Sequence, residues 1–126
     1  MNDPPDDFHQ LAERLLEALS SRDIEMLRSC FAPQAKIWHN VRDSVLTVDQ
    51  VVDTMRGVNA QAIRYTHVRR SLTLDGWAQQ HVVEVVSKSG MLNIMPACHI
   101  VSVSNGKIAR IDEYADSTRQ HALRQT

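Results

Sequence analysis

The stretch AKIWHN, residues 35 to 40, places three different hydrogen-bonding side chains, Trp38, His39 and Asn40, at the end of an apolar strand. Side chains alternate between the two faces of a strand, so His39 shares a face with Ile37, which is expected in the core. An imidazole in a partly desolvated pocket stays neutral and can take or give a proton near neutral pH. His39 is therefore a candidate general acid or base. The alternative is a structural histidine that hydrogen-bonds a neighbouring carbonyl.

Glu113 is the second candidate catalytic residue. It lies in the stretch KIARIDEY, residues 107 to 114, and shares its side of the strand with Ile111, which is expected to face the core or a cavity. Burial in an apolar pocket raises the pKa of a carboxyl group, which suits that group to receive or relay a proton. Alternatively, Glu113 only fixes the strand by bonding Arg110 or a backbone donor.

His99 is the third candidate, and its role depends on which face of its strand points inward. In one phase the inner face carries Asn93, Met95, Ala97, His99, Val101 and Val103. His39, His99 and Glu113 then form a proton-transfer group, and the site gains apolar contacts from Met95 and Ala97. In the other phase Ile94, Cys98 and Ile100 point inward and His99 points outward. Pro96 permits a bulge that switches the phase midway, so both alternatives stay open.

Helical periodicity predicts three helices in the first half of the chain, over residues 6–23, 23–31 and 47–61, the third possibly interrupted near Gly57. A short strand around Ile37 separates the second helix from the third. From Ile63 onward four β-branched stretches, residues 63–74, 77–87, 91–104 and 107–114, predict an antiparallel meander, with hairpin signals at Asp75-Gly76 and Asn105-Gly106. The expected fold is α+β, with the helices lying across one face of a curved sheet.

Length and composition restrict the class of protein. The chain has 126 residues and a formal net charge of −1, which suits one domain over residues 1–126, with tails at 1–6 and 119–126. Near-neutral charge argues against nucleic-acid or membrane partners, and the basic group Arg64, Arg69 and Arg70 is interpreted as the solvated face of a strand. Two cysteines and the absence of a secretory or membrane segment predict a cytoplasmic protein. Metal-ligand and nucleophile motifs are missing, so we expect no metal and no cofactor.

The order of these elements, together with the stretches FAPQAKIWHN and NGKIARIDEYAD, resembles the nuclear transport factor 2-like superfamily in its SnoaL-like branch, related to polyketide cyclases and ketosteroid isomerases. The last stretch carries most of the resemblance, through Gly106, Lys107, Ile108, Ile111, Glu113, Tyr114 and Asp116. The resemblance implies a cone, in which a mainly antiparallel mixed sheet wraps the helices around an apolar pocket. It also implies homodimerisation through the outer face of the sheet.

Aromatic and polar residues on the remaining strand positions complete the candidate site. Tyr65, His67 and His81 reach either the pocket or the outer face, and the outer face is favoured. Trp38 is expected to pack on a helix or at an interface, and Tyr114 either packs structurally or polarises a carbonyl through its hydroxyl. The candidate substrate contacts are Trp38, Asn40, Tyr65, Asn93, Met95, Ala97 and Tyr114.

Two functions of different classes follow from these residues. The first is a cofactor-independent isomerase, cyclase or lyase that acts on a small apolar carbonyl compound. His39 or Glu113 would remove a proton, and His99, Tyr114 or Asn40 would stabilise the developing oxyanion. The second is a noncatalytic ligand-binding or dimerisation domain, in which these polar side chains are only hydrogen-bonding partners in the core. The sequence favours a pocket and leaves the reaction open.

Overall fold

The structure, a computed structural model, describes residues 4–116, and side chains from residue 7 onward. Its helices are α1 (Pro4–Ser21), α2 (Ile24–Ser29) and α3 (Val48–Arg56). Its strands are β1 (Phe31–His39), β2 (Ser44–Leu46), β3 (Ala60–Leu72), β4 (Gly76–Ser87), β5 (Leu92–Ser104) and β6 (Lys107–Ala115). Helix α1 begins inside the segment 1–6 that was expected to be a tail, and the other expected tail, 119–126, lies outside the described residues.

The three predicted helices are confirmed, and local sequence signals explain where two of them begin. The Asp23 side chain accepts a hydrogen bond from the Met26 backbone N–H at the start of α2. Thr47 and Gln50 form a reciprocal capping box at the start of α3. Helix α3 ends at Arg56 and is capped by Gly57, near which the sequence suggested an interruption.

The six strands form one mixed sheet in the order β2-β1-β6-β5-β4-β3. The predicted meander from β3 to β6 is confirmed as antiparallel, whereas β1 pairs with β6 in parallel and with the unpredicted short strand β2 in antiparallel. At the β5–β6 hairpin, Asn105 and Gly106 have φ angles of 52° and 76°, as a tight turn with two left-handed residues requires.

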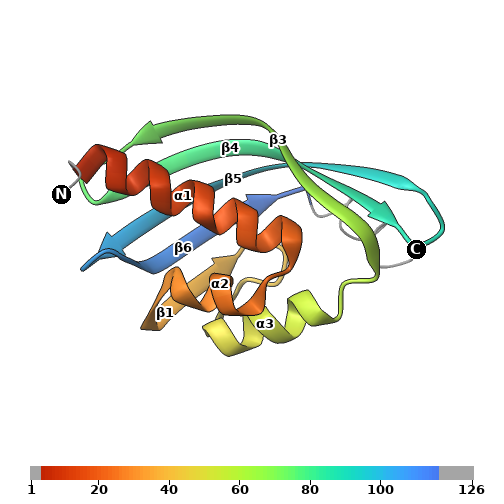
Figure 1. Ribbon diagram of the computed structural model, residues 1–126, viewed down its shortest axis with the longest axis horizontal. Helices are drawn as coiled ribbons and strands as arrows, with labels where there is room; N and C mark the ends of the chain where they lie inside the picture. Colours follow the sequence, from red (N-terminus) through yellow and green to blue (C-terminus); the bar gives the residue numbers. More distant parts are fainter. Residues whose placement is uncertain (1–3, 117–126) are drawn as a thin grey trace.

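The sheet is strongly bent, and α1 lies across its concave face while α2 and α3 lie near β1 (Figure 1). The main core forms where these helices cover the sheet, around Trp77, Val101, Ile111, Leu15 and Leu27. A second, smaller apolar cluster lies farther along the strands and consists of Ala60, Val83, Val85 and Met95, with Ile63 and Tyr65 against it. The α+β fold with a mixed sheet wrapped around three helices is therefore confirmed.

The register of β4 with β5 settles which face of β5 points inward. Pairing runs without a shift from Gly76 with Ser102 to Val86 with Leu92, so Pro96 causes no change of phase. His99 is 3% exposed and Met95 8%, against 49% for Ile100 on the alternate face. The inner face of β5 therefore carries Asn93, Met95, Ala97, His99 and Val101. Among residues 4–116, no helix has the length and apolar character needed to span a membrane.

Gly76 should be essential for the pairing of β4 with β5. A Cβ atom at Gly76 would lie 2.0 Å from the Val101 carbonyl oxygen, whereas at Gly57 the nearest atom would be 3.5 Å away. We predict that Gly76→Ala lowers the free energy of unfolding by about 2 kcal/mol or more, because backbone must shift to relieve the overlap. Gly57→Ala should change it by less than about 0.5 kcal/mol. Urea denaturation measures both, and equal effects would contradict the close approach.

Candidate functional site

A row of polar side chains crosses the concave face next to the main core. The register pairs His39 of β1 with Glu113 of β6, Glu113 with His99 of β5, His99 with Gln79 of β4, and Gln79 with Arg70 of β3. Directly paired residues on neighbouring strands project to the same face with Cβ atoms about 5 Å apart. We call these five residues the polar band. It brings together the three predicted catalytic residues on three adjacent strands.

Glu113 lies in the middle of the predicted catalytic group and is only partly buried. Its carboxylate makes no hydrogen bond with the residues that the structure describes, although its backbone oxygen accepts one from the Asn40 N–H. Burial raises the pKa of the Glu113 carboxyl group from 4.5 to about 7. The alternative in which Glu113 bonds Arg110 or a backbone donor finds no such bond among the described residues, and Arg110 bonds Asp112 instead.

His39 flanks Glu113 on one side. The Val41 backbone N–H donates to His39 Nδ1 at 3.2 Å, so the neutral ring carries its proton on Nε2. Burial lowers the pKa of His39, and the positive charge of Arg42 lowers it further. His39 is therefore a neutral imidazole beside a carboxyl group that is poised near neutral pH.

His99 flanks Glu113 on the other side and is anchored by the main core. The indole N–H of Trp77 donates to His99 Nε2 at 3.2 Å, and both side chains are buried. The pKa of His99 is lowered to about 3, first by burial and then by the charges of His81 and Arg70. Because its Nε2 accepts a hydrogen bond, neutral His99 carries its proton on Nδ1.

His81 and Tyr65 also face inward, which corrects the expectation that they lie on the outer face. His81 is 3% exposed, and its ring lies 5.2 Å from that of Tyr65 and 5.0 Å from that of His99, measured between ring centroids. Burial lowers the pKa of His81 to about 4. Burial raises the pKa of the Tyr65 hydroxyl, and the negative charge of Glu113 raises it further. His67 is exposed, as expected.

Sequence reasoning missed Arg70 and Gln79, which complete the polar band. The Arg70 side chain is 8% exposed and does not belong to a solvated face. It donates from Nε to Gln79 Oε1 at 2.9 Å and from Nη2 to Glu13 Oε1 of α1 at 2.8 Å, and its Nη1 lies 3.2 Å from His9 Nδ1. The signal available was the alternation of Gln79 with Trp77 on β4, which places both on one face.

The remaining predicted contacts divide between the two faces of the sheet. Asn93 and Ala97 face inward near Met95, and the Asn93 amide nitrogen is buried without a hydrogen-bond partner among the described residues. Trp38 and Tyr114 lie together on the outer face, with ring centroids 5.1 Å apart. Trp38 also donates its indole N–H to Asp43 Oδ1 at 3.0 Å, so these two aromatic residues are apart from the polar band.

Asn40 has a structural function in holding β1 to β6. Its amide nitrogen donates to the Ala115 carbonyl at 3.2 Å, and its amide oxygen accepts from the Ala115 N–H at 2.9 Å. Together with the bond from the Asn40 backbone to Glu113, this pair fixes the ends of the two parallel strands. The position of His39 beside Glu113 depends on that fixation.

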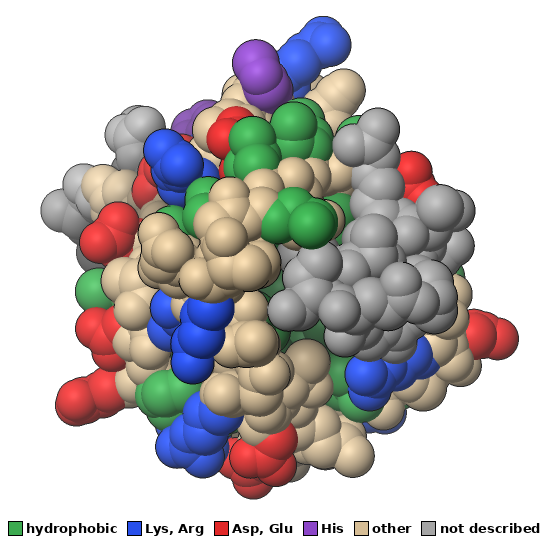
Figure 2. Space-filling model, turned by 90° about the vertical axis from the view of Figure 1, so that its right-hand side faces the viewer, with side chains coloured by type: hydrophobic (Ala, Val, Ile, Leu, Met, Phe, Trp, Pro, Cys, Tyr) green, Lys and Arg blue, Asp and Glu red, His purple; other side chains and the backbone are tan. Residues whose placement is uncertain are grey.

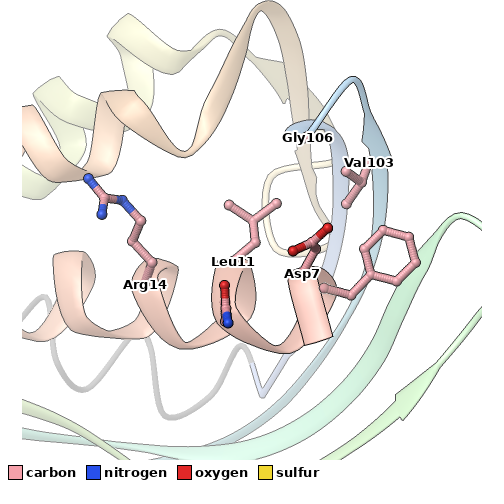
Figure 3. A pocket seen from close by; sticks show the side chains of 7 residues that line it. Asp7, Leu11, Arg14, Val103 and Gly106 are labelled. Carbon is pink, nitrogen blue, oxygen red and sulfur yellow. The ribbon is translucent and has the colours of Figure 1, made fainter. Parts of the chain in front are cut away.

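Two surface hollows are lined by described residues, and both lie away from the polar band. One of about 460 Å³ lies between the first half of α1 and the β5–β6 hairpin, with Asp7, Leu11, Arg14, Val103 and Gly106 around it (Figure 3). The other, of about 350 Å³, lies between α2, β1 and α3. The ligand pocket expected on the concave face therefore stays a prediction. No group of three His, Cys, Asp or Glu side chains within the described part of the chain is arranged to hold a metal ion.

Comparisons with known proteins address the fold. A family model of the SnoaL-like domain matches residues 12–111. No curated protein matches the chain in sequence. Among solved structures, TerC co-crystallised with polyporic acid is 17% identical, with a TM-score of 0.78 over 95% of this chain and 99% of that chain.

Two further solved structures are similar over nearly their whole length. Wild-type IdmH, a putative polyketide cyclase from Streptomyces antibioticus, is 19% identical, with a TM-score of 0.77 over 94% of this chain and 98% of its own. A putative polyketide cyclase from Xanthomonas campestris pv. campestris is 14% identical, with a TM-score of 0.81 over 94% and 96%. At these identities the likeness establishes the fold and not the chemistry.

The buried histidines should make the protein acid-sensitive. His81 and His99 have folded-state pKa values of about 4 and about 3. The unfolded chain, with ordinary values near 6.5, therefore takes up protons that the folded chain refuses as the pH falls. Their stabilisation is present above about pH 6.5 and is lost towards pH 4, while Glu113 acts in the opposite sense between about pH 7 and 4.5.

We predict that His81→Asn reduces the loss of unfolding free energy between pH 7 and pH 4 by roughly 3 kcal/mol relative to the unsubstituted chain. His67→Asn is the matched control, because His67 is exposed and Asn tolerates its φ of 52°. Urea denaturation at a series of pH values measures how the free energy of unfolding changes with pH. This slope is unaffected by any destabilisation that is the same at every pH. Equal slopes in both variants would contradict burial of a neutral His81.

Proposed function

Because the chain belongs to the SnoaL-like domain family, we propose that it binds a small apolar carbonyl compound on the concave face of its sheet and moves a proton on it without a cofactor. The reaction would be that of an isomerase, cyclase or lyase. The resemblance inferred from the sequence is confirmed at the level of the family, whereas the reaction is our proposal. Similar structures, two of putative polyketide cyclases and one co-crystallised with polyporic acid, support a small-molecule ligand.

The observation that carries the proposal is the state of Glu113. It has neutral imidazoles on both sides, its carboxylate has no hydrogen-bond partner among the described residues, and its pKa is about 7. A carboxylate poised there is ionised enough to abstract a proton and basic enough to do so efficiently. Glu113 would act as the general base, holding the abstracted proton and returning it to the ligand, and the Nε2–H of His39 would donate a hydrogen bond within the site. Tyr65, whose hydroxyl stays protonated, would donate to the developing oxyanion.

An apolar surface for the rest of the ligand lies beyond the polar band. Val83, Met95 and Ile63 belong to the second apolar cluster, which continues along the concave face from Tyr65. Figure 2 shows the end of the molecule where β4 turns into β5, with hydrophobic side chains gathered on its upper part, and Lys and Arg side chains below them as well as charged side chains at the margin. We propose that Met95 and Ala97 contact the apolar part of the ligand and that the buried Asn93 amide binds a second polar group on it.

Replacing Glu113 should separate binding from catalysis. The first step is a thermal-shift screen against steroids, aromatic polyketide-like ketones, terpene epoxides and fatty acids. Any compound that binds the folded chain raises the midpoint temperature of unfolding. We predict that Glu113→Gln still shows the shift with the best ligand but loses its turnover by about 10²–10⁴-fold. Turnover by the unsubstituted chain should rise with pH through a midpoint near 7, because the ionised carboxylate is the active form.

Asp112→Asn is the matched control, since Asp112 is the preceding residue on β6 and lies on the opposite face with Arg110. It should retain turnover and the pH midpoint. Full turnover in Glu113→Gln would refute the role of Glu113. Ligand binding without any turnover would favour the alternative, a noncatalytic ligand-binding domain.

We further propose that the outer face of the sheet forms a homodimer. Three large apolar side chains are exposed on that face: Ile94 at 40%, Ile100 at 49% and Tyr114 at 46%. Exposed apolar residues that lie together on one face are typical of an interaction surface. Tyr114 contacts Trp38, which extends the apolar surface towards β1. A cytoplasmic location stays a prediction from the sequence.

A charge placed on the outer face should disrupt this dimer. We predict that Ile100→Asp sediments as a monomer at concentrations where the unsubstituted chain sediments as a dimer, because the carboxylate would be desolvated at the interface. Leu74→Asp, at the fully exposed β3–β4 turn, should leave the dimer intact. Analytical ultracentrifugation measures both. A monomeric unsubstituted chain, or an Ile100→Asp dimer, would refute the interface.

A further inference from the structure

Gln79 occupies a position in which the direction of its hydrogen bonds is fixed by its neighbours. Arg70 can only donate, so the group that it contacts at 2.9 Å must be the Gln79 amide oxygen. The Gln79 amide nitrogen then lies 3.0 Å from His81 Nδ1 and donates to it. Glu13 on α1 holds Arg70 from the other side at 2.8 Å. Arg70 thus donates both to Glu13 on the helix and to Gln79, and Gln79 in turn donates to His81.

This direction determines where the His81 proton is. Because Nδ1 accepts the hydrogen bond from Gln79, a neutral His81 ring must carry its proton on Nε2. That nitrogen has no hydrogen-bond partner among the described residues, and it is shielded from water because His81 is only 3% exposed. An unpaired buried donor costs free energy comparable to a lost hydrogen bond. A ligand atom that accepts a hydrogen bond would remove this cost.

The surroundings of His81 restrict which acceptor it could meet. The rings of Tyr65 and His99 lie on either side of it, and both are neutral groups on the concave face. Tyr65, whose ring lies 5.2 Å from that of His81, is partly exposed, and so is Glu113, whereas His81 itself is buried. The second apolar cluster begins at Tyr65. A ligand lying on that cluster would bring one polar atom to His81.

We propose that His81 Nε2–H is the hydrogen-bond donor that selects a ligand with a carbonyl or enolate oxygen, and that Gln79, Arg70 and Glu13 are positioning residues that keep the proton on that nitrogen. The ligand class is therefore an apolar ketone or its enolate rather than a hydrocarbon of the same shape. This inference rests on the proposed small-molecule function, but it does not depend on Glu113 acting as the base.

The tautomer can be measured without any ligand. Two-bond ¹H–¹⁵N spectra of the histidine rings at pH 8.5 should show His81 protonated on Nε2 in the unsubstituted chain. In Gln79→Glu a carboxylate replaces the amide donor, so Nδ1 should become protonated and donate to it. Gln80→Glu adds the same charge at the exposed neighbouring position and should leave Nε2 protonated. A proton on Nδ1 of the unsubstituted chain, or no change in Gln79→Glu, would overturn the assignment.

The ligand class is tested with a matched pair of probes, 2-acetylnaphthalene and 2-ethylnaphthalene, which differ in the carbonyl oxygen. The unsubstituted chain should bind the ketone roughly tenfold more tightly, as one hydrogen bond to a buried donor provides. His81→Phe keeps an aromatic ring without the donor and should bind both equally, whereas Gln80→Glu should retain the preference. No preference in the unsubstituted chain, including no binding of either probe, would overturn the ligand assignment, as would a preference that survives in His81→Phe.

Glu113→Gln distinguishes this inference from the proposed function. It should leave both the His81 tautomer and the preference for the ketone unchanged even where turnover is lost. If Glu113 proves to have no part in catalysis, the preference for the ketone still stands or falls with His81 alone.

Discussion

The buried guanidinium of Arg70 is the interaction on which the arrangement of the concave face depends. Polar groups next to an apolar core are stable only when they are hydrogen-bonded, and the polar band has little access to water on its core side. Arg70 satisfies Gln79 in the sheet and Glu13 in α1, so a single side chain also fixes the helix against β3 and β4. Trp77 satisfies His99 in the same way from the core. The two donors orient both inner histidines.

The same arrangement divides the inner face of the sheet into zones with different functions. The row with Trp77, Val101 and Ile111 is covered by helices and contributes stability through apolar burial. The polar band follows two residues farther along each strand, and the second apolar cluster follows the band. Proton transfer is therefore assigned to this row, with the donors His81 and Tyr65 beyond it, between a closed core and a surface suited to apolar ligands. The outer face, with Ile100 and Tyr114, has no part in that row.

Sequence reasoning correctly predicted the features that depend on local pattern. It failed for residues whose orientation depends on pairing between strands that are distant in the sequence. Helix caps, the Asn105-Gly106 turn and the strands are local signals, and the phase of His39 and Glu113 followed from alternation. Arg70 could not be found in this way. Arg70 lies five positions after Tyr65 on β3, whereas their partners on β4, Val83 and Gln79, are four positions apart, because a bulge near His67 inserts one residue. Strict alternation from Tyr65 would have turned Arg69 inward instead.

The electrostatic character of the site follows from these placements and limits its ligands. Burial keeps His39, His81 and His99 neutral at pH 7, and it keeps the Tyr65 hydroxyl protonated. Glu113 is then the group of this inner site that changes charge near neutral pH. The fixed cation of the polar band, Arg70, is already paired with Glu13, so negative charge on a ligand would be stabilised by N–H and O–H donors. That favours a neutral carbonyl compound whose charge appears only during proton transfer, because a ligand that is already anionic would meet the ionised Glu113 and be repelled.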